Sequence, residues 1–352
     1  MSATTRRIVR FVLPVIVSGC LAAITPWSPA GRAATPSPAD HRAEKAILRR
    51  MGWRRLRVHD PSAIMRQGRL YWIFFTGWGI QSAYSTNLVR WHAGPSVFPH
   101  PPAWTRKVVP GFRGFFWAPD IIHLHGLYLL YYAVSTWGSR ISAIGLATNK
   151  TLNPHSPRFH WNDQGLVFHT TDADNYNAID PAVSLDYSGR LWMSFGSFSS
   201  GIKLIALNSL TGKPSSPHPR ILPLAWHRTI EASYIYRHGG YYYLFVNWGY
   251  CCRGIHSTYN IRVGRSRHIQ GPYLDKAGRN MLHGGGTLLL GSTGPFIGPG
   301  QTGIFRNKGR LFLTCHFYDA LRNGRPRLAI LPLRFNHGWP HIEPWPTTAV
   351  HR

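Results

Sequence analysis

The 352-residue sequence predicts an all-β fold, a five-bladed β-propeller, and three observations support this prediction. No long stretch carries apolar residues at helical spacing. Short aromatic and β-branched runs between glycine-containing turns occur throughout the chain, and such runs are typical of strands. A unit made of a turn, a strand and further short strands recurs five times, which is typical of propeller blades.

Each repeat has a turn of one kind followed by an apolar strand. The turns are Gln67–Arg69, His125–Gly126, Ser188–Arg190, His238–Gly240 and Lys308–Arg310. The strands that follow them are Leu70–Thr76, Leu127–Val134, Leu191–Phe195, Tyr241–Val246 and Leu311–Cys315. A second strand is predicted at Ser142–Thr148, Ile202–Leu207, Ile261–Ser266 and Arg327–Leu333. We therefore expect five four-stranded blades.

An acidic residue precedes four of the five turns in a similar local sequence. These residues are Asp60, Asp120, Asp180 and Glu231, and Gln301 has the same place in the fifth repeat, at intervals of 60, 60, 51 and 70 residues. The innermost strand of every blade lines the central channel, so side chains at this position should converge. Asp-Pro is a common turn dipeptide, but turn chemistry does not explain Glu231. With only 13 acids in the chain, their shared phase favours a functional site.

The charge balance of the chain is strongly basic, with 40 Lys and Arg against 13 Asp and Glu and a net charge of +27. Nucleic-acid binding usually gathers such residues in one patch or on one helix face. Here they are scattered near turns, so no nucleic-acid partner is expected. Two interpretations remain open: attraction to an acidic polymer such as pectin, and solubility in an acidic medium.

Residues 1–34 have the composition of an export signal rather than of a folded segment. Arg6, Arg7 and Arg10 precede the apolar stretch Phe11–Val17, and small residues follow. The protein is therefore expected to be secreted or periplasmic. The residues before Cys20 also fit a lipoprotein signal, in which case a lipid attached to Cys20 would anchor the protein. Residues 35–352, which keep a net charge of +23 because residues 1–34 hold four arginines and no acid, are expected to form a single, monomeric propeller domain.

Three cysteines follow the signal: Cys251, Cys252 and Cys315. They cannot all pair within one chain, and no CxxC metal spacing is present. We expect buried free thiols, with a disulfide between Cys251 and Cys252 as the alternative.

The ordered motifs of the chain resemble glycoside hydrolase family 43, arabinanase branch, from about Arg57 to Pro344. The motifs are HDPS (His59–Ser62), FRGFFWAPDI (Phe112–Ile121), VSTWGS (Val134–Ser139), IGLATNKTL (Ile144–Leu152), NAIDP (Asn177–Pro181), FGSF (Phe195–Phe198), IEASYI (Ile230–Ile235), CCRG…STYNIRVGRS (Cys251–Ser266) and GPGQTG (Gly298–Gly303).

This resemblance implies an endo-acting hydrolase of α-1,5-linked L-arabinan that inverts the anomeric configuration. Asp60 would be the general base, Glu231 the general acid, and Asp180 would orient the acid and raise its pKa, while Asp120 would be structural. Inversion needs one carboxylate to activate water and one protonated carboxyl to protonate the leaving oxygen. Two alternatives are an exo-acting arabinofuranosidase or xylosidase on the same propeller, and a non-catalytic carbohydrate-binding propeller. The presence of all three acids disfavours the second.

The resemblance also implies substrate contacts and raises the question of a metal. The substrate contacts fall at Trp117, Trp137, Gly138, Asn177, Ala178, Ile179, Ser197, Phe198 and Ser199. Trp117 and Trp137 would stack on furanose rings, whereas Ser199 stands where the family commonly has a stacking Trp. No cofactor is needed for the chemistry. Gln301 replaces a family histidine that holds a metal ion through water, so a structural or pKa-tuning Ca²⁺ at Gln301 and His316 is left open, with a core role as the alternative for His316.

Overall fold

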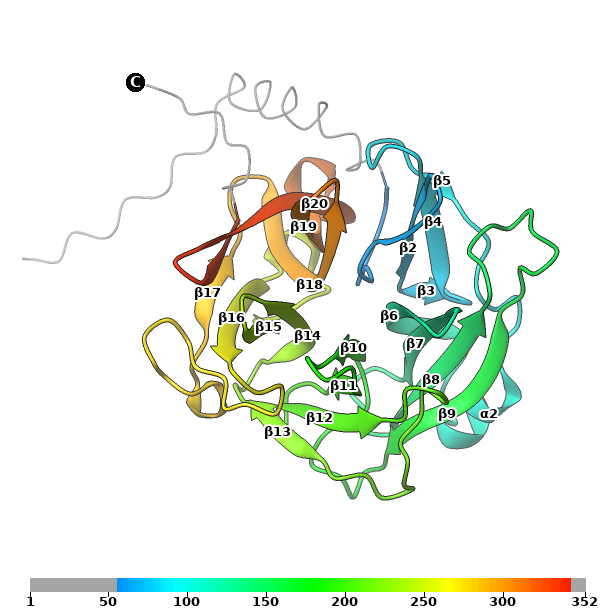
Figure 1. Ribbon diagram of the computed structural model, residues 1–352, viewed down its shortest axis with the longest axis horizontal. Coiled ribbons are helices and arrows are strands. Elements are labelled where there is room, and N and C mark those ends of the chain that lie inside the picture. The colour runs from blue at the N-terminus through cyan, green and yellow to red at the C-terminus, as the bar shows by residue number, and fades with distance from the viewer. Residues whose placement is uncertain (1–55, 343–352) are drawn as a thin grey trace, which may run out of the picture.

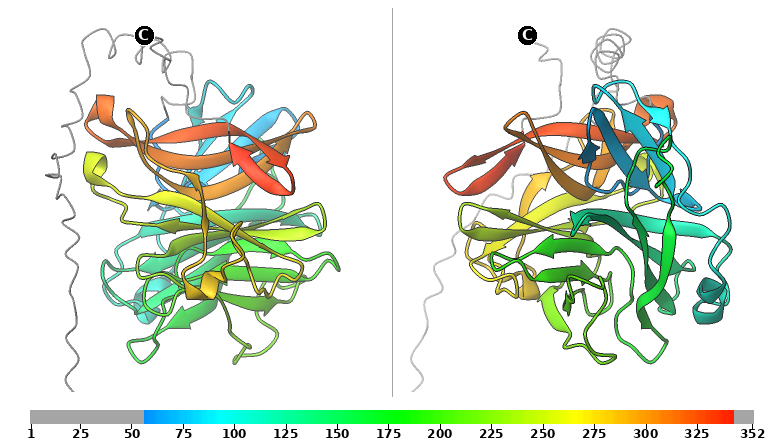
Figure 2. Two further views of the ribbon diagram at one scale, coloured as in Figure 1. Left: turned by 90° about the vertical axis from the view of Figure 1, so that its left-hand side faces the viewer. Right: turned by 45° about the vertical axis from the view of Figure 1, so that its right-hand side comes forward.

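The computed structural model describes residues 56–342, and these residues form a five-bladed β-propeller. Five antiparallel sheets are arranged round a central channel, with β6, β10, β14 and β18 nearest the centre in Figure 1. Seen from the side, the sheets are stacked on one another round the ring (Figure 2). The predicted export signal at residues 1–34 and Cys20 lie outside the described residues.

The strands of each blade follow one another in chain order. The first blade contains β1 (Met65–Gln67), β2 (Leu70–Phe75), β4 (Gln81–Ser85) and β5 (His92–Ala93). The second contains β3 (Gly77–Trp78), β6 (Phe115–Leu124), β7 (Leu127–Ser135), β8 (Ser142–Asn149) and β9 (Asn162–Thr170). The third contains β10 (Ala182–Leu185), β11 (Leu191–Phe195), β12 (Ile202–Leu207) and β13 (Leu222–Ala225).

The remaining two blades have the same order. The fourth contains β14 (Glu231–His238), β15 (Tyr241–Trp248), β16 (Asn260–Ser266) and β17 (Thr287–Leu290). The fifth contains β18 (Phe296–Asn307), β19 (Arg310–Asp319), β20 (Arg325–Asn336) and β21 (Trp339–Ile342). The helices of the described part are short: α2 (Ala103–Val108), η2 (Gly254–His256), η3 (Met281–His283) and η4 (Ala320–Arg322). No helix of residues 56–342 has the length and apolar character to cross a membrane.

All nine predicted strands are present, and two of them, Leu191–Phe195 and Ile202–Leu207, have the predicted bounds. In each of the five repeats, the turn that precedes the apolar strand contains a glycine in the left-handed region. Gly189 and Gly309, for example, have φ of 82° and 77° and open space where a side chain would stand. The backbone conformation, not crowding, therefore requires glycine at these turns.

The expectation of four strands in every blade was wrong for the second blade. There β3 pairs with the start of β6, with Trp78 opposite Phe115. This two-residue strand belongs to the loop that joins β2 to β4 in the first blade, so it ties the two blades together. A strand so short has no sequence periodicity by which it could be predicted.

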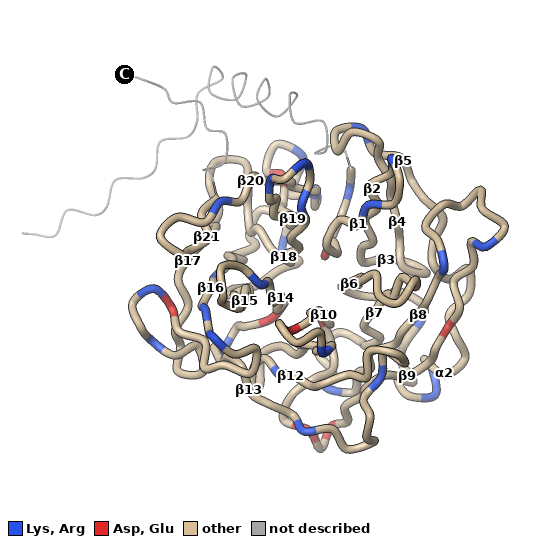
Figure 3. The backbone as a smooth tube through the Cα atoms, viewed as in Figure 1, with Lys and Arg blue, Asp and Glu red and all other residues tan. Residues whose placement is uncertain are grey.

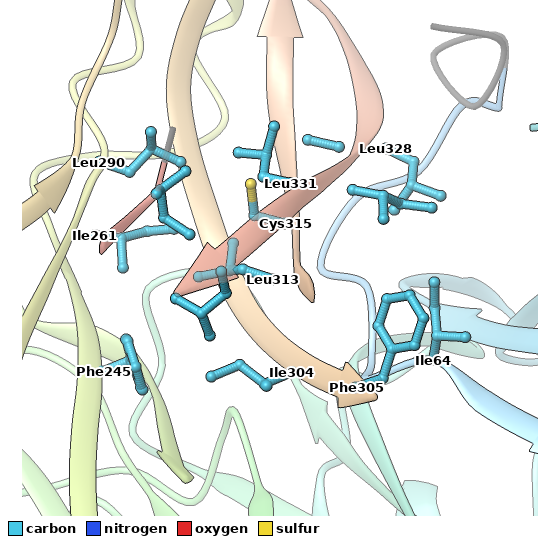
Figure 4. Close-up of a cluster of buried hydrophobic side chains, with 14 of the residues drawn as sticks. Ile64, Phe245, Ile261, Leu290, Ile304, Phe305, Leu313, Cys315, Leu328 and Leu331 are labelled. Atoms are coloured by element: carbon cyan, nitrogen blue, oxygen red, sulfur yellow. The ribbon is translucent and has the colours of Figure 1, made fainter. Parts of the chain in front are cut away.

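Among the described residues the ring closes without a strand shared between its first and last blades. A hydrophobic cluster instead joins the fifth blade to the fourth and the first, and Leu313, Cys315 and Ile64 are among its members (Figure 4). Hydrogen bonds add to this contact: the Tyr71 hydroxyl donates to Asn307 Oδ1 at 2.8 Å. Side-chain packing therefore holds the ring closed.

The expectation of free thiols at Cys251 and Cys252 was wrong, since the two residues form a disulfide with each other and Cys252 is exposed. Cys252 has φ of 67°, a conformation that the vicinal bond requires of the loop and that the sequence does not reveal. Cys315 is free and buried, as expected.

The charged residues have an uneven distribution in the described part of the chain. Lys and Arg segments are spread over the strands and loops of the blades, most of them away from the centre, whereas acidic segments occur both on outer loops and close to the centre beside β10 and β14 (Figure 3). Most of the basic charge therefore lies at the periphery, and acidic residues are present at the channel.

Candidate active site

The inner strands bring the predicted acids to one end of the channel. Asp60 lies just before β1, Asp180 just before β10, and Glu231 is the first residue of β14. Each inner strand runs from this end of the channel toward the turn that begins the next strand, so residues at its start meet those of the other blades. The predicted convergence is confirmed by their electrostatic interactions, because the charges of Asp180 and Asp60 both act on Glu231.

The backbone is bent at each of these positions. Asp60, Asp180 and Gln301 have φ of 46°, 54° and 59°, in the left-handed region that non-glycine residues seldom adopt. In β14 the register shifts between Glu231 and Tyr234, and Ala232 has φ of 54°. Such irregularities turn side chains away from the regular strand direction, and strained backbone is common at functional sites.

Asp60 is held as an ionised carboxylate by polar neighbours from three elements. Its Oδ2 accepts a hydrogen bond from Thr76 Oγ1 at 2.7 Å and lies 2.8 Å from His59 Nδ1. Its backbone N–H donates to His316 Nδ1 at 3.1 Å. Burial by itself would raise the pKa of Asp60, but His59, then His316 and Thr76, outweigh it and lower the pKa to about 2.

His59 is the cationic partner of Asp60. Burial lowers its pKa, but the carboxylates of Asp60 and Asp180 outweigh burial, so the pKa lies above its usual value. Its Nε2 is 2.8 Å from the Tyr318 hydroxyl, which also accepts the Cys252 N–H at 2.7 Å. A charged imidazole bonded at both nitrogens fixes the orientation of the Asp60 carboxylate.

Glu231 and Asp180 show the opposite behaviour. Burial, together with the charges of Asp180 and Asp60, raises the pKa of Glu231 well above its ordinary value. Burial and the charge of Asp60 also raise the pKa of Asp180 to about 7, while the Ala232 N–H donates to its Oδ2 at 3.1 Å. The site therefore holds one ionised carboxylate, Asp60, and a coupled pair of carboxyl groups, Asp180 and Glu231. The pair as a whole keeps at least one proton in weakly acidic solution.

Tyr259 makes a direct contact with the candidate acid. Its hydroxyl donates a hydrogen bond to Glu231 Oε1 in the interior of the protein. This bond opposes the other influences on Glu231 because it stabilises the ionised carboxylate. The ring lies against the backbone of Gly300, where a side chain would come within 2.3 Å of it. Glycine at this point therefore lets Tyr259 reach Glu231.

Asp120 has the structural position that was predicted for it. Its Oδ2 accepts the backbone N–H of Val183 in the next blade at 2.9 Å. Burial raises its pKa to about 6. It thus joins the inner strands of the second and third blades.

Of the two predicted stacking residues, Trp137 is exposed and Trp117 is half-buried. Trp117 and Trp137 have ring centroids 6.3 Å apart in an edge-to-face arrangement. Trp137 is 77% exposed, on the loop between β7 and β8, beside Gly138, which has φ of 75°. Two accessible indole rings are thereby presented near the acids.

The other predicted substrate positions form the rim at the third blade. Asn177 and Ser197 hold each other by hydrogen bonds, with Asn177 Nδ2 donating to Ser197 Oγ at 2.8 Å. Phe198 stacks with Tyr250 at 6.2 Å. The side chains of Ala178 and Ile179 are buried, and the Ile179 carbonyl accepts the Gly196 N–H at 2.8 Å.

The stacking surface that Ser199 lacks is partly supplied by a residue the sequence did not indicate. Trp226, which is 44% exposed, donates from its indole Nε1 to the Ser199 carbonyl at 2.9 Å. An indole ring thus lies beside this position although it comes from the connection between the third and fourth blades.

The candidate metal position can be tested against the residues present. His316 is buried and adjoins Gly300 in the β18–β19 pair, next to Gln301. Its Nε2 has no hydrogen-bond partner within residues 56–342. Burial, together with the nearby charge of His59, lowers the pKa of His316 to about 3, so the ring is neutral. Because Nδ1 accepts the Asp60 N–H, Nε2 carries the proton and can donate it to the oxygen of a water molecule. These features fit a water molecule of a hydrated cation, and a Ca²⁺ held in this way stays a prediction.

Four residues of the site were not singled out from the sequence: His59, Thr76, Tyr259 and Tyr318. Both His59 and Tyr259 lie within motifs that carry the family resemblance. His59 could have been singled out because it adjoins Asp60, and Tyr259 because it belongs to the STYNI motif. Thr76 reaches Asp60 through the folding of the first blade, and Tyr318 reaches His59 from the fifth blade, so neither contact is visible in the sequence.

Two buried carboxyl groups with opposite pKa shifts, at the mouth of a propeller channel lined with aromatic rings, define the site of a glycoside hydrolase. Residues 54–340 match the family model of glycosyl hydrolases family 43, and the chain belongs to that family.

The similar proteins include both exo-acting and endo-acting enzymes. The chain is 41% identical over 312 residues to an extracellular exo-α-(1→5)-L-arabinofuranosidase of Cellvibrio japonicus, covering 83% of this chain and 88% of that protein. It is 41% identical over 288 residues to an extracellular endo-α-(1→5)-L-arabinanase of Bacillus subtilis, covering 80% and 87%. The structure of a Cellvibrio cellulosa α-L-arabinanase complexed with arabinohexaose superposes with a TM-score of 0.78 at 41% identity, covering 82% and 96%.

Proposed function

We propose that this protein is a secreted hydrolase of α-1,5-linked L-arabinan, with endo action and inversion of the anomeric configuration. The observation that carries the proposal is the opposite pKa shift of two carboxyl groups that interact across the channel, Asp60 downward and Glu231 upward. Both 41%-identical relatives act on α-1,5-linked arabinose and are named as extracellular.

In the single displacement Asp60 is the general base. A water molecule between Asp60 and the anomeric carbon loses a proton to the carboxylate as its oxygen forms the new bond to that carbon. The low pKa of Asp60 keeps the carboxylate ionised above about pH 3, and the bond from Thr76 together with the His59 cation fixes its direction. A fixed orientation is needed because the water must approach from the face opposite the leaving group.

In the same step Glu231 is the general acid. Its proton moves to the glycosidic oxygen as the bond from that oxygen to the anomeric carbon breaks, so the departing chain leaves as a neutral alcohol. Burial and the charge of Asp180 keep Glu231 protonated in weakly acidic solution. After one turnover Asp60 is protonated and Glu231 is ionised, and proton exchange with solvent restores both.

The test is incubation with linear, debranched and branched α-1,5-arabinan, followed by product sizing and NMR of the anomeric proton. We expect oligosaccharides of mixed length at early times, and a newly formed reducing end with the β configuration. An α-configured product would contradict inversion. Binding of arabinan without any cleavage would instead support a carbohydrate-binding propeller.

The runner-up is exo action, and the specific observation in its favour is the C. japonicus relative, which is as similar to this chain as the endo-acting one. Release of a single small product from the start of the reaction, with slow loss of polymer length, would establish it. A xylosidase would cleave aryl xyloside in preference to arabinan.

The proposed chemistry requires no cofactor. A hydrated Ca²⁺, where present, would be held by His316 and Gln301 through water and would add positive charge near the acids. We further propose that the enzyme acts as a monomer, and that the basic periphery attracts it to acidic pectin in which arabinan is embedded.

A further inference from the structure

The surface beside the candidate active site carries a second aromatic pair, Trp78 and Phe115, that the proposed reaction does not use. Trp78 is 60% exposed and Phe115 is 41% exposed. Their rings meet edge to face with centroids 5.6 Å apart. Exposed large aromatic side chains that gather in one place on a soluble protein indicate a binding surface.

This pair, called here the outer aromatic pair, is joined to the active site through the backbone. Thr76, which donates to Asp60, begins the loop that carries Trp78, and its Oγ1 also accepts the N–H of Ala118 at 2.9 Å. β3 and β6, which carry the two rings, lie side by side between the first and second blades in Figure 1. The pair is therefore at the same end of the channel as Asp60.

The pair also continues the row of rings that begins with Trp137 and Trp117. Phe115 and Trp117 are two residues apart in β6, so their side chains share one face about 6.8 Å apart along the strand. Phe116 between them points the other way and is fully buried. The order of the rings on this face is therefore Trp137, the half-buried Trp117, Phe115 and Trp78.

Trp78 is held in place before any ligand arrives. Its ring lies over Gly114, where a Cβ atom would come within 3.5 Å of the indole and within 2.7 Å of Pro101. Its carbonyl accepts a hydrogen bond from the Gln81 side chain at 2.6 Å. A ring fixed in this way loses little conformational freedom on binding, which favours affinity.

We propose that the outer aromatic pair is a distal sugar-binding subsite that holds α-1,5-linked arabinofuranose residues several units away from the bond that is cleaved. This inference rests on the proposed function. The occupant is the same polysaccharide chain, because Phe115 lies two residues from Trp117 on the same strand face, and Trp117 in turn contacts Trp137. A neutral sugar chain presents C–H faces that suit aromatic rings, and rings two residues apart along a strand can serve successive sugars.

The test compares a long with a short substrate in Trp78→Ala and Phe115→Ala. The ratio of kcat/KM for linear α-1,5-arabinan to that for arabinotriose should fall about five- to tenfold in each variant, since loss of one aromatic contact is worth about 1 kcal/mol. Trp78→Phe should restore most of the ratio because it keeps a ring. Tyr187→Ala is the matched control: it removes a 54%-exposed aromatic side chain from the turn between β10 and β11, at the other end of the channel.

Electrophoresis through gels that contain linear arabinan separates this inference from the proposed function. Retardation of the wild type and of Glu231→Ala, with weaker retardation of Trp78→Ala, supports the subsite even where hydrolysis is slow. Equal ratios for all variants, or retardation that Trp78→Ala does not weaken, would overturn it. A wild-type dimer in sedimentation velocity that Trp78→Ala converts to monomer would also overturn it, because the pair would then bind a second copy. Failure of the wild type to cleave any arabinan would refute the proposed function alone.

Discussion

Replacing Tyr259 by Phe tests the acid assignment through one hydrogen bond. The Tyr259 hydroxyl donates to Glu231 Oε1, and both side chains are buried. The bond favours the ionised form of Glu231, so its removal should raise a pKa that burial and Asp180 already hold above the ordinary value. A buried hydrogen bond to a charged group is worth about 1.5–3 kcal/mol, and one pKa unit corresponds to about 1.4 kcal/mol. The expected increase is therefore about one to two units.

The general acid acts only while it carries its proton, so the alkaline limb of the pH–rate profile reports the pKa of Glu231. In Tyr259→Phe this limb of kcat/KM for arabinotriose should move to higher pH by about one to two units. Tyr234→Phe is the matched control, because it removes a buried hydroxyl of the same blade that bonds the Ile304 carbonyl at 3.3 Å instead. An alkaline limb that stays in place, or moves to lower pH, would refute the role of the bond or of Glu231 as the acid.

Asp180→Asn should move the same limb to lower pH, because a negative charge that raises the pKa of Glu231 disappears; a shift upward would contradict this. Glu231→Ala should abolish arabinan cleavage but reduce hydrolysis of an aryl arabinoside with an activated leaving group far less, whereas Asp60→Ala should slow both by about 10²–10⁴-fold; equal losses in Glu231→Ala would exclude it as the acid. Leu313→Ala, in the cluster that closes the ring, should cost about 2–5 kcal/mol and lower Tm by about 5–15 °C in calorimetry, and an unchanged Tm would show that the blades relax around the cavity. Binding to polygalacturonate should weaken steeply as salt rises, and salt-independent binding would leave only the solubility interpretation of the charge.

The convergence of Asp60, Asp180 and Glu231 could be predicted because the repeat places each of them at the start of an inner strand. The same phase also identified Asp120, and the structure confirms that it joins two blades. The residues that tune the acids could not be predicted in this way. Tyr259, immediately before β16, lies in a motif of the resemblance, but its contact with Glu231 depends on how β16 is placed in the blade, which the motif does not reveal.

Other differences from expectation have local causes. The two-residue strand β3 exists because of a tertiary contact with β6, not because of any pattern in its own sequence. The bond between Cys251 and Cys252 depends on a left-handed backbone at Cys252, which cysteine content and spacing do not indicate. In both cases the decisive information lies in backbone geometry that the loop adopts only in the folded protein.

Within residues 56–342 no strand is shared between the first and last blades. Apart from β3, which lies in the β2–β4 loop of the first blade but pairs in the second, each blade is built from one continuous segment of the chain. The chain could therefore begin at a different blade while every blade kept its place in the ring. A circular permutant that began between two blades would leave every sheet whole, whereas in a propeller that completes one blade with strands from both ends it would sever that blade.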